Sequence, residues 1–169
     1  MTTTILPLGS ENGFALSVDL DEQDNLWFTN GLDGIKKLNT QTGKIETFNT
    51  SNTLIPTDEI IALTVTKEGN VWMSASDQII YYNPSSLSFR KYDQLDGVSI
   101  KLSPSSICER SNDHLIFGGE SAFLELDPNS LGTEFDTTEI IFTDLKINNQ
   151  SIPTTACLLY TSPSPRDRG

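Results

Sequence analysis

One segment of this chain occurs three times. Its copies span residues 18–28, 63–73 and, more faintly, 107–117, so that equivalent positions lie 45 and then 44 residues apart. A constant period of this length is typical of a β-propeller, in which each repeat forms a four-stranded sheet. Such a sheet buries both of its faces only when neighbouring sheets stack on it. The repeat therefore predicts an all-β chain made of propeller blades.

Apolar and polar residues alternate within each repeat, which is the pattern of half-buried β-strands. The expected strands cover residues 14–20, 26–29, 34–39 and 44–48 in the first repeat, 60–66, 71–74, 78–82 and 88–92 in the second, and 106–109, 115–118 and 122–126 in the third. They make up about three four-stranded antiparallel blades, whereas a closed ring has roughly four to eight. The sequence therefore predicts an incomplete β-propeller whose remaining blades lie upstream.

The repeat pattern stops after residue 128. We expect propeller blades over residues 1–130, a polar hinge over residues 131–138, and the start of a second domain over residues 139–155. This second domain would open with a long strand that leads into a hairpin at Asn148-Asn149. A polar, glycine-containing joint of this kind suits relative motion of two domains.

The last residues need separate treatment. The run from Cys157 to Asp167 resembles the in-frame translation of a transposase sequencing adapter. Residues 156–169 are therefore interpreted as a tail of non-native origin and left out of fold reasoning. On this interpretation we expect the natural protein to be longer than this chain.

The net charge of −12 at pH 7 argues against two classes of partner. No basic stripe is present to neutralise phosphates, so we expect no nucleic-acid contact by this segment. Anionic lipid headgroups would also repel such a surface. No run of apolar residues is long enough to span a bilayer, and the first residues do not form a signal peptide. Outside the tail, Cys108 is the single cysteine and is predicted to be a small core residue.

The residues also suggest a family. The stretch 25–29, followed by 34–39 and 42–48, resembles the two-component regulator propeller repeat. The stretch 115–128, followed by 140–149, resembles the final blade and the first strand of the Ig-like Y_Y_Y domain in hybrid two-component sensor kinases of Bacteroidetes-type bacteria. This resemblance implies an incomplete propeller followed by the first strand of an Ig-like β-sandwich.

The resemblance also implies a function. This chain would be part of a periplasmic sensor that recognises an oligosaccharide or other carbohydrate-derived ligand and signals to polysaccharide-utilisation genes. The intact protein would be a homodimer, tethered to the inner membrane by a helix downstream of this chain. Its histidine kinase activity would lie outside this chain. No catalytic residue, cofactor or metal ligand is expected in the residues present.

Candidate ligand-binding residues follow from the propeller geometry, in which the loops between second and third strands share one face with the connections between blades. On that face we expect Asn30, Asp33, Asp77 and Glu120 to offer hydrogen-bonding groups to a polyhydroxylated sugar. For any one of them taken alone, an ordinary solvated loop residue is the simpler interpretation.

Other conspicuous residues have simpler interpretations. Trp27 and Trp72 hold equivalent positions in successive repeats, which indicates packing between blades. The acidic run from Asp19 to Asp24 lacks the glycine and distal glutamate of an EF-hand loop, so we expect an acidic hairpin turn. His114, the single histidine, has no second metal ligand or nucleophile at a suitable spacing and is expected at a strand edge.

Two alternatives to the sensor hypothesis stay open. The stretch 25–29 with 42–45 also resembles blades of streptogramin-lyase-like propellers, whose chemistry needs histidine and acidic residues on one face. A propeller that only binds other proteins is equally compatible with the composition.

Overall fold

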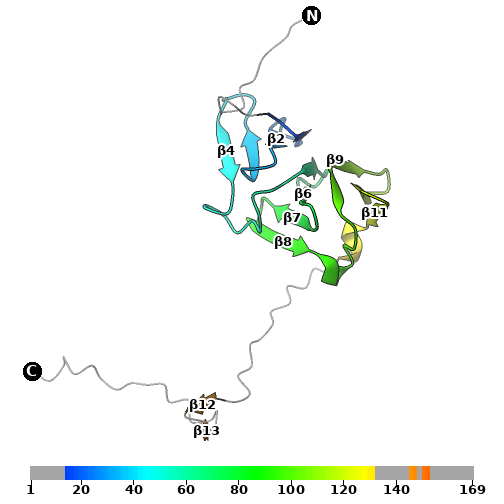
Figure 1. Cartoon of the computed structure of the whole chain (residues 1–169). Coiled ribbons are helices and arrows are strands. Elements are labelled where there is room, and N and C mark those ends of the chain that lie inside the picture. The colour runs from blue at the N-terminus through cyan, green and yellow to red at the C-terminus, as the bar shows by residue number, and fades with distance from the viewer. Residues whose placement is uncertain (1–13, 132–144, 148–149, 153–169) are drawn as a thin grey trace, which may run out of the picture. The chain divides into compact units, whose positions relative to one another are not determined.

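The computed structural model describes residues 14–131, 145–147 and 150–152 (Figure 1). The chain divides into two compact units, residues 1–131 and 132–169. In the described part of the first unit, all regular structure is antiparallel β-sheet apart from two short 3₁₀ turns. The predicted all-β architecture is confirmed.

Each repeat forms one sheet. The first sheet contains β1 (Ser17–Leu20), β2 (Leu26–Thr29), β3 (Ile35–Leu38) and β4 (Ile45–Phe48), and the second contains β5 (Ala62–Val65), β6 (Val71–Ser74), β7 (Ile79–Asn83) and β8 (Ser88–Tyr92). The third contains β9 (Leu102–Glu109), β10 (Leu115–Gly119) and β11 (Phe123–Leu126). The 3₁₀ turns are η1 (Gln94–Asp96) and η2 (Pro128–Ser130). In the four-stranded sheets, each strand pairs with the next one along the chain.

The predicted strands of the three repeats are confirmed to within a few residues. The largest difference is β9, which begins at Leu102 instead of residue 106. Its early residues still belong to the sheet because Leu102 pairs with Gly119 beyond an irregularity in the register between β9 and β10.

All three sheets begin with the same hairpin turn. In the first, the amide of Asp24 donates to the Asp21 carbonyl at 3.0 Å, and Gly69 and Asp113 make the same bond in the second and third. Asp24, Gly69 and Asp113 have positive φ angles of 59°, 79° and 63°. Glycine and aspartate are among the residues that tolerate this backbone conformation best. The repeat seen in the sequence therefore extends to the backbone of its turns.

The hydrophobic core lies between the sheets. Trp27 on β2 packs with Met73 and Tyr82 of the second sheet, whereas Trp72 on β6 packs with Leu115 and Phe117 of the third. Both tryptophans are almost completely buried, at 1% and 3% exposure. Their predicted role in packing between blades is confirmed.

The outer face of the third sheet is less covered than its inner face. Cys108 and Phe123 lie on the outer face, in register with Ile116 and Gly118, and both are exposed. The prediction that Cys108 is a core residue is wrong for the described residues. Its side chain points away from the second sheet, and no described element stacks on that side.

The second unit contributes one described hairpin, β12 (Leu145–Ile147) and β13 (Gln150–Ile152). Ile147 pairs with Gln150, which confirms the predicted hairpin at residues 148–149. The rest of the predicted long strand, most of the hinge over 131–138, and the tail over 156–169 lie outside the described residues. In the described part of the chain, no helix has the length and apolar character needed to cross a membrane.

Candidate functional site

The connections at one end of the three sheets form the candidate site. Because consecutive strands are antiparallel, the loops after β2, β6 and β10 lie at the same end as the connections after β4 and β8. We call these segments the loop face, and they comprise residues 30–34, 75–78, 120–122, 49–61 and 93–101.

Hydrogen bonds between segments make the loop face an ordered surface. Gly34 donates its amide to the Asp58 carbonyl at 2.8 Å, and the Thr29 hydroxyl donates to the Ile60 carbonyl at 2.8 Å. Further along, the Glu120 amide donates to the Lys101 carbonyl at 3.0 Å. Each connection between sheets is therefore fixed to a neighbouring hairpin loop.

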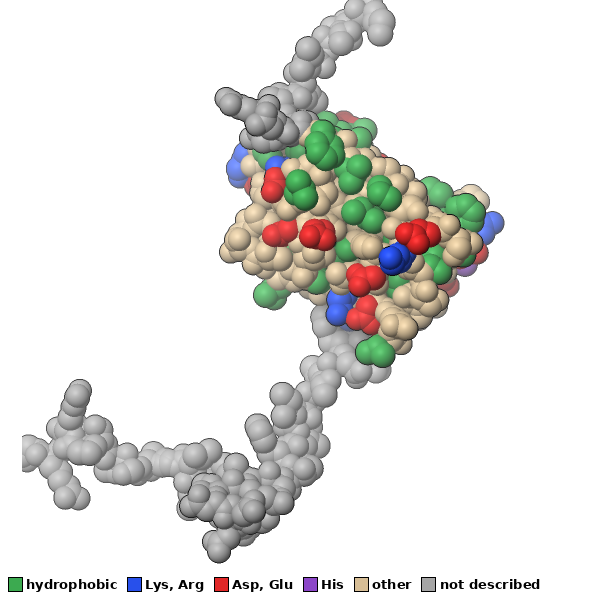
Figure 2. Space-filling model, viewed as in Figure 1, with side chains coloured by type: hydrophobic (Ala, Val, Ile, Leu, Met, Phe, Trp, Pro, Cys, Tyr) green, Lys and Arg blue, Asp and Glu red, His purple; other side chains and the backbone are tan. Residues whose placement is uncertain are grey.

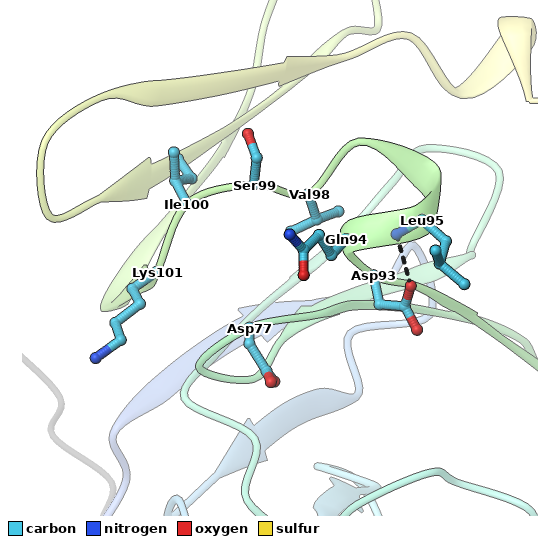
Figure 3. Close-up of a pocket in the computed structure, with 8 residues that line it drawn as sticks. All are labelled: Asp77, Asp93, Gln94, Leu95, Val98, Ser99, Ile100 and Lys101. Carbon is cyan, nitrogen blue, oxygen red and sulfur yellow. Dashed lines mark hydrogen bonds between the residues drawn. The ribbon is translucent and has the colours of Figure 1, made fainter.

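An open pocket with a volume of about 480 Å³ lies on the loop face where the second sheet meets the third (Figure 3). It is formed by the loop after β6 and by the connection between β8 and β9. The residues that line it are Asp77, Asp93, Gln94, Leu95, Val98, Ser99, Ile100 and Lys101. Its lining combines an amide, a hydroxyl, carboxylates, an ammonium group and aliphatic side chains.

The wall of this pocket is preorganised by η1. The Asp93 carboxylate accepts the Leu95 amide at 2.9 Å, and the Asp96 carboxylate accepts the Asp93 amide at 2.9 Å. Gly97 ends the turn with a φ of 99°, which a residue with a side chain would rarely adopt. Val98 then anchors the segment, with only 6% of its surface exposed. Hydrogen bonds and burial within the chain therefore fix the shape of this wall.

The lysine beside η1 neutralises one of the pocket's carboxylates. Lys91 lies 2.9 Å from Asp93, and this hydrogen bond, reinforced by the Leu95 amide, lowers the pKa of Asp93. Asp93 therefore stays ionised while contributing little net charge to the pocket.

Of the four predicted ligand-binding residues, Asp77 alone lines this pocket. Its side chain is exposed on the loop that follows β6 (Figure 3). Glu120 is also exposed, and its backbone is bonded to that of Lys101. The structure therefore places Glu120 next to a residue of the pocket lining, but not in the lining itself.

Asn30 and Asp33 lie on a different loop and bind each other. The Asn30 amide donates to the Asp33 carboxylate at 2.8 Å, and the Asn30 side-chain oxygen accepts the Asp33 amide at 3.0 Å. The bond from Asn30 is the main reason that the pKa of Asp33 is lowered. These two residues shape the loop after β2, and no described contact links them to the pocket.

Sequence reasoning did not single out Gln94, Leu95, Ser99 and Lys101. They belong to a connection that was correctly expected on this face, but no motif distinguishes them from other loop residues. Leu95 is 96% exposed although it follows an ordered cap. Only the structure identifies them as pocket residues, because the pocket forms where η1 packs beside the loop after β6.

The acidic run near residue 20 forms the predicted hairpin turn. Asp21 is buried there and accepts hydrogen bonds from Asn25, from the Trp27 indole at 3.1 Å and from Lys37. No group of three potential metal ligands occurs among the residues that the structure describes.

His114 immediately precedes β10, away from the loop face. Its Nδ1 lies 2.9 Å from the Glu125 carboxylate, which Arg110 also contacts at 2.7 Å. The bond to His114, followed by that to Arg110, lowers the pKa of Glu125. His114 is the last residue of the turn before β10, next to its predicted position in a strand, and its partners form an exposed charge cluster at the end of the sheet opposite the pocket.

Comparison with known proteins gives one similar curated sequence. Histidine kinase P4 of Formosa agariphila is 29% identical over 85 residues, which are 50% of this chain and 6% of that protein. No family model matches the chain.

Solved structures share the arrangement of the sheets. The extracellular domain of the hybrid two-component system BT3049 from B. thetaiotaomicron superimposes with a TM-score of 0.62 and 18% identity, over 82% of this chain and 20% of that domain. Virginiamycin B lyase from Staphylococcus aureus superimposes with a TM-score of 0.50 and 20% identity, over 72% of this chain and 43% of the lyase.

These similarities show a β-propeller type of fold, shared with extracellular domains of hybrid two-component systems. The expected resemblance to hybrid two-component sensors is confirmed by the BT3049 domain and by the histidine kinase of Formosa agariphila. The lyase shows that the same sheet arrangement also serves an enzyme, so the fold alone does not define the activity.

Proposed function

We propose that this chain is part of the ligand-sensing region of a hybrid two-component sensor histidine kinase and faces the periplasm. The observation that carries the proposal is the agreement of two independent similarities. A sensor domain matches the fold over most of the chain, and a histidine kinase matches the sequence over half of it. In this proposal the chain has no catalytic activity, and the kinase activity belongs to another part of the intact protein.

The proposed ligand is an oligosaccharide or a related carbohydrate bound at the loop-face pocket. Gln94, Ser99 and Asp77 can exchange hydrogen bonds with hydroxyl groups, while Leu95 and Ile100 can pack against the C–H groups of a sugar ring. Sites for small ligands commonly combine apolar walls with a few fixed polar groups. Asn30, Asp33 and Glu120 are proposed as further contacts for a ligand that extends beyond the pocket.

Transmission of the signal would use the second unit. In the proposal, residues 131–138 are a hinge and residues 139–155 begin a Y_Y_Y-type Ig-like domain. Ligand binding to a homodimer would reorient this domain relative to the propeller and act through a downstream membrane helix on genes for polysaccharide use. A ligand can drive such a change only as far as it prefers one arrangement over the other.

A lyase-like activity finds less support in the site. Acid–base catalysis needs a proton donor or acceptor within reach of the bound substrate. His114 is the single histidine of the chain, and it lies at the opposite end of its sheet from the pocket and pairs with Glu125. We therefore favour binding over turnover at the loop face.

The most direct test is the gene itself. Sequencing the source genome downstream of residue 155 should reveal an Ig-like segment, one membrane helix and the motifs of a histidine kinase in the same reading frame. A stop codon soon after that position, without a helix or kinase motifs, would contradict the proposal.

The binding site requires a second experiment. The intact sensor region would be titrated calorimetrically with a panel of neutral, amine-bearing and acidic oligosaccharides. A Gln94→Ala, Ser99→Ala variant should lose about tenfold in affinity for the sugar that binds. Ser86→Ala, in the turn after β7 at the other end of the same sheet, should bind like the unmodified protein. Equal affinities in all three proteins would place the ligand elsewhere.

A further inference from the structure

The loop face carries more negative charge than its lysines neutralise. Figure 2 shows acidic side chains distributed over one side of the described unit, with some basic side chains among them. The loop face holds one lysine, Lys101, and seven carboxylates, namely Asp33, Asp58, Glu59, Asp77, Asp93, Asp96 and Glu120. Lys36 and Lys91 on the adjoining strands pair with Asp33 and Asp93. Even with these two paired lysines, the seven carboxylates of the loop face outnumber the lysines that neutralise them.

Within the pocket, Asp77 is the carboxylate that remains without a described cationic contact. Lys91 forms an ion pair with Asp93, and its interaction with Asp77 is electrostatic only, without a hydrogen bond. The backbone next to Lys101 is bonded to that next to Asp77, from the Leu102 amide to the Ser76 carbonyl at 2.8 Å, but the Lys101 side chain does not point toward Asp77 (Figure 3). The backbone bond from Glu120 to Lys101 holds a further carboxylate-bearing residue next to that lysine.

We propose that this pocket selects neutral or amine-bearing ligands and rejects ligands that carry carboxylate, sulfate or phosphate groups, with Asp77 as the main specificity-determining residue. The proposal rests on the proposed function only in that it assigns the sensed ligand to this pocket. Removing a charge from water without a partner is unfavourable, and a nearby like charge adds to that penalty. An acidic sugar at this position would meet both effects, whereas an ammonium group would gain a partner in Asp77.

The local potential can be measured without knowing the ligand. In the full chain with Cys108→Ser and Cys157→Ser, a single new thiol is introduced by Ser99→Cys in the pocket lining. Its rates of reaction with dianionic dithiobis(nitrobenzoate) and with uncharged dithiodipyridine are compared. The ratio of the two rates reports the electrostatic potential, because a change in thiol pKa affects both reagents alike. Ser86→Cys, exposed in a turn without charged residues, is the matched control.

The expected result is an anionic-to-neutral rate ratio that is lower at Ser99→Cys than at Ser86→Cys, on the order of threefold at low salt. Adding Asp77→Asn should remove about half of this difference, Lys101→Gln should enlarge it, and high salt should abolish it. Tryptophan fluorescence would verify that each variant keeps its buried tryptophans. Equal ratios at the two positions, or no response to Asp77→Asn, would overturn the proposal.

The sugar panel then separates this proposal from the proposed function. If no oligosaccharide binds but the thiol ratios are as expected, the carbohydrate assignment fails and the charge selectivity of the pocket stands. If an acidic oligosaccharide binds best and its affinity does not rise in Asp77→Asn, the selectivity proposal is wrong although the sensor function survives.

Discussion

The first and second sheets have the same strand order and the same hairpin turn, but they place different residues at one equivalent buried polar position. Residue 21 in the first sheet and residue 66 in the second precede equivalent hairpin turns, and each is 7% exposed. The first is an aspartate and the second a threonine. Because both side chains are equally buried, a comparison of their neighbours shows which hydrogen bonds and charges a buried carboxylate needs and a buried hydroxyl does not.

Around Asp21 the first sheet supplies a full set of donors. The carboxylate accepts the Asn25 amide side chain at 3.0 Å and the Trp27 indole at 3.1 Å, and Lys37 lies 3.1 Å away. Burial alone would raise the pKa of Asp21, but the bonds from Asn25, Trp27 and Lys37 outweigh it and lower the pKa to about 2. A buried charge is thus stabilised because every partner is present.

In the second sheet, the neutral residues Thr66 and Tyr81 stand where the first sheet has the charged pair Asp21 and Lys37. Tyr81 pairs across from Trp72 as Lys37 does from Trp27, and its hydroxyl donates to Asn70 at 3.1 Å. The Thr66 hydroxyl is buried without a hydrogen-bond partner. The same backbone turn therefore forms with either side chain at this position. A charged side chain there requires donors and a cation around it, and a neutral one does not.

The largest effect should come from removing the buried carboxylate. Asp21→Ala leaves Lys37 and the Trp27 indole without their acceptor, which we expect to lower the free energy of unfolding by about 3 kcal/mol or more. Thr66→Ala at the equivalent position should cost about 1 kcal/mol or less, because no hydrogen bond is lost. Urea unfolding followed by tryptophan fluorescence would measure both. Similar losses in the two variants would refute the contrast between the sheets.

The second prediction concerns pH. With a pKa of about 2 in the folded state and 3.8 as the ordinary value, ionised Asp21 contributes about 2 kcal/mol of stability. Because the folded pKa is the lower one, this contribution is complete above about pH 4 and is lost as the pH falls toward 2. Unfolding of the unmodified chain and of Asp21→Asn should therefore differ most near neutral pH and converge in acid. A constant difference between the two proteins would show that Asp21 does not titrate as described.

A smaller effect is expected from the cross-strand partners of the tryptophans. Lys37→Met removes the ion pair with Asp21 and the cation that lies 4.9 Å from the Trp27 ring, at an expected loss of about 1 to 2 kcal/mol. The counterpart Tyr81→Phe loses the hydroxyl's neutral hydrogen bonds, to Asn70 at 3.1 Å and from Asn83 at 3.3 Å, which together are worth about 1 kcal/mol. Thermal unfolding of the two variants would rank them. The ranking would be reversed if the Asp21 cluster were held mainly by Asn25.

The sequence predicts the sheets well because the repeat and the alternation of apolar residues both report local geometry. Trp27 and Trp72 were correctly placed between blades because equivalent residues of a repeat occupy equivalent positions. Cys108 was misplaced because alternation shows that a strand has two faces but does not show which face is covered. That information lies in the neighbouring sheet, and no described sheet covers the outer face of β10.

The candidate site was less predictable. The rule that places certain loops on one face led to Asp77, which lines the pocket, and to Glu120, which lies beside the lining but not in it. Gln94 and Ser99 could not be distinguished, since the pocket arises from the way η1 packs beside the loop after β6. Asn30 and Asp33 attract attention as polar loop residues, but they bind each other. A sequence identifies which side chains could bind a ligand, and the structure shows which of them are already occupied.

The smallest predicted effect tests whether the unpartnered hydroxyl of the second sheet is a weakness. Thr66→Val replaces that hydroxyl with a methyl group of similar shape, so the folded state no longer buries a polar atom without a partner. We expect a gain of up to about 1 kcal/mol in the free energy of unfolding.

Thr64→Val is the matched control, because Thr64 is equally buried, at 7% exposure, but donates to the Asp19 carboxylate at 2.8 Å. The control should lose about 1 to 2 kcal/mol, since a charged acceptor loses a donor. Opposite signs in the two variants, measured by urea unfolding under one set of conditions, are the expected result. A loss of similar size in both would mean that the Thr66 hydroxyl has an acceptor after all, and that the second sheet satisfies its buried polar groups as completely as the first.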